Sequence, residues 1–91
     1  MNYYILSYTT GENYLEERVK YRQEHLNHAT EYFNEGYLTL GGAIDSANEA
    51  VLVFKAESDK IVKAFAENDP YVKNGLIKSW MVKKWNVVIG N

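Results

Sequence analysis

Residues 50–56, Ala-Val-Leu-Val-Phe-Lys-Ala, decide the fold of this chain. They predict a β-strand, because β-branched and aromatic residues dominate the segment and turn-forming residues precede it. Val51 and Val53 would share one face of that strand, and Leu52 and Phe54 the other. Because both faces are apolar, the sheet that contains this strand should be covered on both sides.

Outward from this strand, helical and extended patterns alternate along the chain. The predicted strands are residues 3–8, 37–44, 50–56 and 76–88, and the predicted helices are residues 14–35 and 59–67. Gly36 can take the left-handed conformation that ends the first helix, and Ser58 is a good N-cap for the second. The order is β-α-β-β-α-β, the ferredoxin-like pattern. We therefore expect an α+β fold with a four-stranded antiparallel sheet and two helices on one face.

The first helix carries an apolar stripe at steps of three and four residues, which predicts the side that faces the core. The stripe consists of Leu15, Val19, Arg22, Leu26, Ala29 and Phe33. Arg22 lies near its centre, where an aliphatic residue is expected. It could pair internally with a carboxylate, anchor a ligand oxyanion, or extend its guanidinium to solvent.

Two helices cover only one face of a four-stranded sheet. The other face would expose more apolar surface than a small monomer normally tolerates. Packing of two sheets face to face removes this surface, so the sequence predicts a homodimer. A ligand cavity against the same face is the alternative, and the two can coexist.

The size and composition of the chain exclude several classes of protein. We expect a single domain over residues 1–91, because 91 residues leave no room for two. There is no cysteine, the formal net charge is −2, and no apolar run approaches the ~20 residues of a membrane span. We therefore expect a soluble, cytoplasmic protein whose partners include neither nucleic acid nor membrane.

Two side chains are candidates for acid–base chemistry. His25 lies about 80° from the centre of the apolar stripe, at the boundary between core and solvent. There it could act as a general base or acid, or simply pack its ring. Asp69 precedes Pro70 and could cap a helical turn, or it could orient a histidine.

Two further patterns have both a structural and a functional interpretation. Gly41-Gly42 lies inside a predicted strand, where glycine marks either a bulge or the close approach of a ligand. His25 and His28 have the spacing H-x-x-H, but no third ligand is clearly placed beside them. We therefore expect no metal site and no organic cofactor.

Several short motifs together resemble the YciI-like (YCII-related) family. They are Arg22-Gln23-Glu24-His25-Leu26, Gly36-Tyr37-Leu38, Gly41-Gly42, Asp69-Pro70-Tyr71 and Gly75-Leu76. The resemblance covers nearly the whole chain and implies a dimeric α+β barrel. It also implies an active site built on His25 and Asp69, with Arg22 matching the arginine of the same motif. Members of such a family include a dehalogenase-type lyase that removes HCl from a chlorinated hydroquinone.

The sequence thus leads to three hypotheses of function. The first is an enzyme with His/Asp general acid–base chemistry, of lyase, dehalogenase or isomerase type, acting on a small cyclic or aromatic substrate. Its catalytic residues would be His25 and Asp69, and its substrate-binding residues would be Arg22, Gly41, Gly42 and Tyr71. The alternatives are a dimeric module that binds a metabolite without turnover, and a structural or interaction domain. Asp45, in a turn without glycine, is a second candidate partner for His25.

Overall fold

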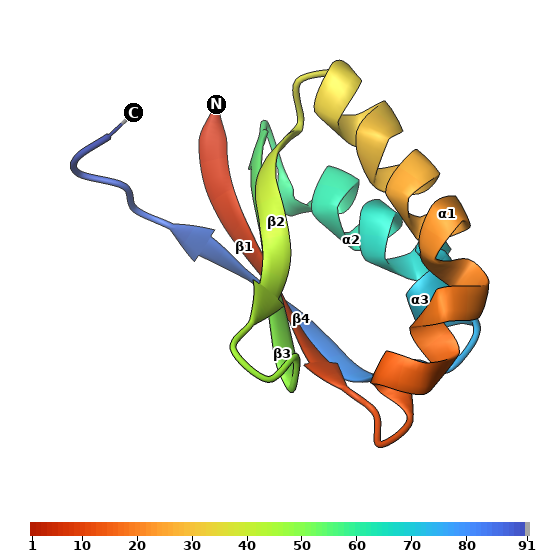
Figure 1. Ribbon diagram of the computed structural model, residues 1–91. Coiled ribbons are helices and arrows are strands. Elements are labelled where there is room, and N and C mark those ends of the chain that lie inside the picture. Colours follow the sequence, from red (N-terminus) through yellow and green to blue (C-terminus); the bar gives the residue numbers. More distant parts are fainter. Residues whose placement is uncertain (91) are drawn as a thin grey trace.

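The computed structural model describes residues 1–90 and contains one four-stranded antiparallel sheet covered by helices on one side. The sheet has the order β2-β3-β1-β4, so the first and third strands lie at its centre. Figure 1 shows all three helices on the same face. The elements are β1 (Asn2–Thr10), α1 (Tyr14–Asn34), β2 (Leu38–Ile44), β3 (Glu49–Ala56), α2 (Asp59–Asn68), α3 (Pro70–Lys73) and β4 (Ile77–Trp85).

This arrangement confirms the predicted ferredoxin-like α+β fold. β1 pairs with β3 and with β4, and β2 pairs with β3, all antiparallel. One boundary was predicted wrongly, because β4 ends at Trp85 and does not continue to residue 88. Val87 donates its backbone hydrogen bond to the carbonyl of Trp85, which bends the chain out of the ladder.

Local sequence signals set the ends of the helices as expected. The Ser58 side chain accepts a hydrogen bond from the backbone N–H of Lys60, which makes it the N-cap of α2. Gly36 has a φ of 88° and follows α1, in the conformation that costs glycine least. Pro70 occupies the first turn of α3, directly after the Asp69 cap.

The core lies between the sheet and α2. Alternate residues of β1 point to the helices, and Tyr4, Leu6 and Tyr8 are all buried there. Val62 and Phe65 of α2 are fully buried against them. α2 therefore covers the centre of the sheet, while α1 packs mainly against α3 and the edge strand β2.

The predicted buried stripe of α1 is wrong for most of its residues, although Ala29 does pack against the core. Leu15, Val19, Leu26 and Phe33 are exposed, with Val19 showing 75% of its surface. The face that turns inward is instead formed by Tyr14, Arg18, Tyr21, His25, His28 and Tyr32. Tyrosine and histidine bury an apolar ring while their polar atoms find partners, so a pattern that counts aliphatic residues misplaces this face.

A β-bulge is present in β2, but it does not involve the glycines. The register with β3 shifts between Leu38 and Leu40, so Thr39 is the extra residue. The Thr39 hydroxyl donates to the Val53 carbonyl at 2.9 Å. Gly41 and Gly42 pair regularly with β3, so the bulge explanation of the two glycines is wrong.

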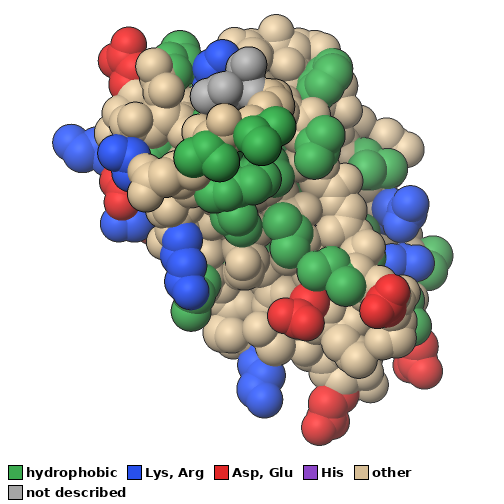
Figure 2. Space-filling model, turned by 90° about the vertical axis from the view of Figure 1, so that its left-hand side faces the viewer, with side chains coloured by type: hydrophobic (Ala, Val, Ile, Leu, Met, Phe, Trp, Pro, Cys, Tyr) green, Lys and Arg blue, Asp and Glu red, His purple; other side chains and the backbone are tan. Residues whose placement is uncertain are grey.

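The sheet face away from the helices is largely apolar. Leu40 is 69% exposed and Met81 53% exposed, and Trp85 and Ile44 are also open to solvent. Figure 2 shows this face with hydrophobic side chains gathered near its middle. Within residues 1–90, no helix is long and apolar enough to cross a membrane.

Candidate functional site

His25 and Asp69 are in contact, although 44 residues separate them in the sequence. His25 lies on the inward face of α1, and Asp69 lies in the short link between α2 and α3. The ring Nδ1 of His25 is 2.8 Å from Oδ1 of Asp69. Because a carboxylate oxygen only accepts hydrogen bonds, Nδ1 carries the hydrogen and Nε2 is left with a free lone pair.

Asp69 is fully buried, and three donors hold its carboxylate in place. Oδ1 accepts from His25 and from the backbone N–H of Tyr71 at 3.0 Å, and Oδ2 accepts from the Tyr8 hydroxyl at 2.7 Å. A buried carboxylate is costly without such bonds. Asp69 is thus both the N-cap of α3 and the hydrogen-bond partner of His25.

The imidazole ring of His25 is held by a stacking contact on one face as well as by the hydrogen bond at Nδ1. Its plane is stacked on the ring of Tyr71, with 3.9 Å between centroids and an angle of 6° between planes. Tyr14 meets the same Tyr71 ring edge-on. The imidazole is therefore oriented by a carboxylate and an aromatic ring before any ligand arrives.

The open side of His25 faces a cavity of about 260 Å³ between α1 and the edge of the sheet. Its floor is formed by small residues of β2 and β3, including Gly41, Gly42, Ala43 and Ala50. A methyl group added at Gly41 would lie 3.0 Å from Cγ of Leu52, so a larger residue there would intrude on the floor. The remaining lining residues are Tyr8, Tyr14, Arg18, Arg22, His25, Leu26, Leu52 and Tyr71.

Two arginines give this cavity a positive end. Arg18 and Arg22 both line it, one helical turn apart. Burial raises the pKa of the Tyr71 phenol, and the positive charges of Arg22 and Arg18 partly oppose that rise. Arg22 is exposed rather than buried, which corrects the prediction that it lies at the centre of a core stripe. It lines the cavity, and its role as a ligand anchor stays a prediction.

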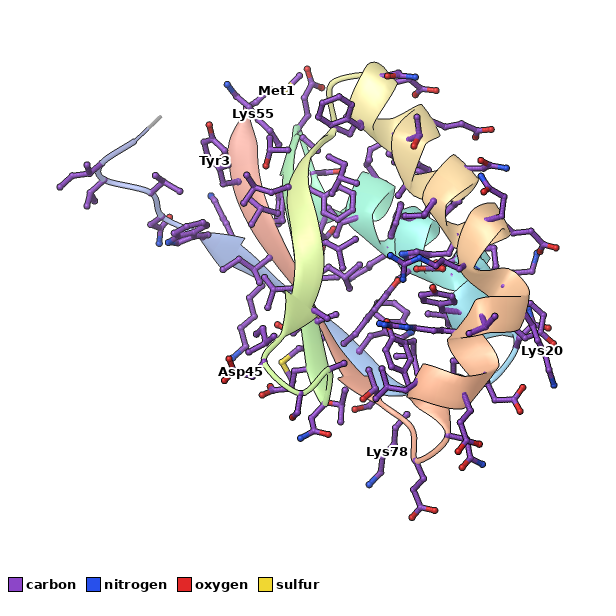
Figure 3. The ribbon with its side chains drawn as sticks, viewed as in Figure 1. Met1, Tyr3, Lys20, Asp45, Lys55 and Lys78 are labelled. Atoms are coloured by element: carbon purple, nitrogen blue, oxygen red, sulfur yellow. The ribbon has the colours of Figure 1, made fainter. Side chains whose placement is uncertain are left out.

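The other candidates lie apart from this cavity. Asp45 is exposed in the turn between β2 and β3 with a φ of 43°, and Figure 3 shows it at the far end of that turn from the helices. Asp69, not Asp45, is therefore the partner of His25. Nε2 of His28 donates to the Phe65 carbonyl at 2.9 Å, and its ring is stacked on the Phe65 ring. A larger hollow of about 500 Å³ near Gly11 and Gly75 contains none of the predicted site residues.

Sequence reasoning missed Tyr8 and Arg18. A signal for Tyr8 was present, because strand alternation places it beside Leu6 in the core, where a phenol needs a hydrogen-bond partner. Arg18 precedes Arg22 by four residues and His25 by seven, so all three share one face of α1. The assumption of an aliphatic core stripe concealed this face.

The environment of Tyr8 predicts a loss of stability at high pH. Burial, and then the charge and hydrogen bond of Asp69, raise the pKa of Tyr8 above its ordinary value of 10.0. The folded chain thus holds this proton more tightly than the unfolded chain, so the stabilisation is complete below about pH 10 and is lost as the pH rises further. We expect the urea concentration at the midpoint of unfolding to be lower at about pH 11 than at about pH 9. Tyr8→Phe, which has no such proton, should show a smaller fall, and an equal fall would contradict this role.

The fold and this geometry define a class of protein: a ferredoxin-like α+β domain with a histidine–aspartate pair beside a small cavity. The chain belongs to the YCII-related domain family, whose model matches residues 1–86. No relative was found among curated proteins.

Solved structures share the fold. The 5-chloro-2-hydroxyhydroquinone dehydrochlorinase of Burkholderia phenoliruptrix, in complex with 2,5-dihydroxybenzoquinone, is 24% identical with a TM-score of 0.77, over 92% of this chain and 93% of that one. A protein of Agrobacterium tumefaciens is 19% identical with a TM-score of 0.62, over 98% and 95% of the two chains. A NIPSNAP domain protein of Burkholderia xenovorans is 18% identical with a TM-score of 0.59, over 98% and 96%. At these identities the likeness shows the fold alone.

Proposed function

We propose that this protein is a small-molecule enzyme in which His25 and Asp69 perform general acid–base chemistry. The reaction would be of lyase, dehalogenase or isomerase type, on a small cyclic or aromatic substrate. The observation that carries the proposal is the oriented imidazole: Nδ1 is bound to a buried carboxylate and the ring borders a cavity. A base held in this way needs no reorganisation before it accepts a proton.

In the proposed step, Nε2 of His25 removes a proton from an acidic carbon or hydroxyl of the substrate. Asp69 stabilises the imidazolium that forms. In an elimination, the electron pair of the broken bond forms a double bond, and the leaving group departs with its own pair. In an isomerisation, the imidazolium returns the proton to another carbon. Arg22 would hold the oxyanion or phenolate that develops, and Gly41, Gly42 and Tyr71 would contact the ring.

The size of the cavity and one structural relative support this substrate class. A volume of about 260 Å³ lies just below the range of about 300–1,000 Å³ typical of ligand pockets, which suits a ligand as small as one substituted ring. The similar dehydrochlorinase forms a complex with 2,5-dihydroxybenzoquinone, a molecule of that size.

Deuterium exchange tests the proposal without requiring the natural substrate. Purified protein would be incubated in D2O with 2,5-dihydroxybenzoquinone and a panel of small cyclic ketones, with and without a carboxylate group, and the loss of C–H signals would be followed by proton NMR. We expect at least one compound to exchange faster with the protein than in buffer of the same pH. Binding without faster exchange across the panel would favour the alternative, a dimeric module that binds a metabolite without turnover.

We also propose that the chain forms a homodimer through the open face of its sheet. This face is apolar over β2 and β4, with Leu40, Met81 and Trp85 exposed. Sedimentation equilibrium should give about twice the 10.5 kDa mass of the chain. Met81→Lys places a charge on this face and should shift the protein to monomer, whereas Lys20→Glu on the outer side of α1 should not. A monomeric wild type would contradict the proposal.

A further inference from the structure

Arg18 and Arg22 present two positive charges to the cavity, whereas the proposed proton transfer uses only that of Arg22. Within the part of the chain that the structure describes, the ion pairs are Lys20–Glu17, His25–Asp69 and Lys63–Asp59, so neither arginine has a carboxylate partner. No residue that lines the cavity is acidic. The carboxylate of Asp69, which contacts His25 beside the cavity, is already bonded to three donors.

This positive end is unusual for the chain as a whole, whose formal net charge is −2. Like charges one turn apart repel each other and weaken a helix slightly. The guanidinium of Arg18 lies over the ring of Tyr14, another lining residue, at 5.5 Å from its centroid, which favours its place beside the cavity. A bound anion would neutralise both charges, and a carboxylate matches the planar fork of arginine.

The spacing along α1 sets the outline of the ligand. At 1.5 Å per residue, Arg18 and Arg22 are about 6 Å apart along the helix axis, and Arg22 and His25 about 4.5 Å. If the anionic group of a cyclic ligand binds between the two arginines, an atom on the opposite side of the ligand ring would therefore lie beside the His25 imidazole.

We propose that the substrate of this site is a small carboxylic acid, monocyclic or of similar size, whose carboxylate binds between Arg18 and Arg22 while its acidic carbon faces His25. The proposal rests on the proposed function, since it assigns a substrate class to the same cavity. It adds Arg18 to the binding residues and requires a permanent charge on the substrate, in addition to the oxyanion that forms during the reaction.

Binding of two matched probes tests the proposal. The probes are 2,5-dihydroxybenzoate and 2,5-dihydroxybenzamide, which share a ring and differ in the charge of one group. Titrations would be followed by backbone amide shifts in NMR spectra of the full chain. We expect the acid to bind about tenfold or more tightly than the amide. Arg18→Gln and Arg22→Gln should each lower the affinity for the acid by about tenfold and change the affinity for the amide by less than about twofold.

Lys20→Gln is the matched control, because Lys20 is a cation on the same helix that points away from the cavity (Figure 3). It should change neither affinity. Equal binding of the two probes, equal weakening of both by the arginine variants, or no binding of either probe at about 10 mM would each overturn the proposal. These outcomes can be distinguished from those of the deuterium-exchange experiment. If exchange is accelerated but the acid is not preferred, only the proposed carboxylate site is excluded. If the acid is preferred but exchange is not accelerated, only the acid–base function is excluded.

Discussion

Replacement of His25 by asparagine should lower the protein-dependent rate of deuterium exchange by about 10²–10⁴-fold, the usual contribution of one placed acid–base group. Asparagine can still donate a hydrogen bond to Oδ1 of Asp69, so the buried carboxylate keeps its partners. It has no basic nitrogen to accept a proton at neutral pH. The expected result is thus a loss of proton transfer with the cavity and the fold preserved, measured by proton NMR in D2O.

His28→Asn is the matched control for this variant. His28 lies on the same helix, three residues further along, but its Nε2 donates to the Phe65 carbonyl and its half-buried ring is stacked on the Phe65 ring. This change should lower stability while leaving the exchange rate per folded molecule unchanged. If His25→Asn keeps the wild-type rate, the acid–base function is excluded. If both histidine variants lower the exchange rate equally, the substitutions act by disturbing the fold and not by removing a proton acceptor.

The fold was predictable because strand alternation and helix caps are local signals. Alternation in residues 50–56 identified a central strand, and Ser58 and Gly36 marked helix ends. The orientation of α1 was not predictable by the same reasoning. Its inward face is aromatic, and Tyr32 packs edge-on against Phe54 and Phe65. Such contacts depend on elements that are distant in the sequence, whereas a periodic pattern measures only the side chains of one helix.

The candidate site was predictable only in part, because local signals mark single residues but not the contacts between them. The Asp69-Pro70 pair marked a helix start, and the resemblance to a family joined Asp69 to His25. The contact itself depends on α3 packing against α1, which no spacing in the sequence specifies. The cavity was also not predictable, because it depends on the register of two strands, in which Gly41 pairs with Leu52 and Ala43 with Ala50.

Replacement of Asp69 by alanine should have the largest effect on stability, about 3–5 kcal/mol. It leaves the buried Tyr8 hydroxyl without an acceptor, removes the partner of His25, and takes the cap from α3. A 91-residue domain has a free energy of unfolding of about 5–14 kcal/mol, so this loss is a large fraction of the total. Urea unfolding at fixed protein concentration, followed by tryptophan fluorescence, measures it.

Asp69→Asn separates the charge of Asp69 from its shape. The asparagine oxygen can still accept from His25 and from the backbone of Tyr71, because both donors bind Oδ1. Its amide nitrogen then faces the Tyr8 hydroxyl, which can rotate from donor to acceptor. We therefore expect a cost of only about 1–2 kcal/mol, the difference between charged and neutral hydrogen bonds. If the asparagine and alanine variants are equally unstable, the charge of Asp69 and not its hydrogen-bond geometry stabilises the fold. If both match the wild type, the buried network does not contribute to stability.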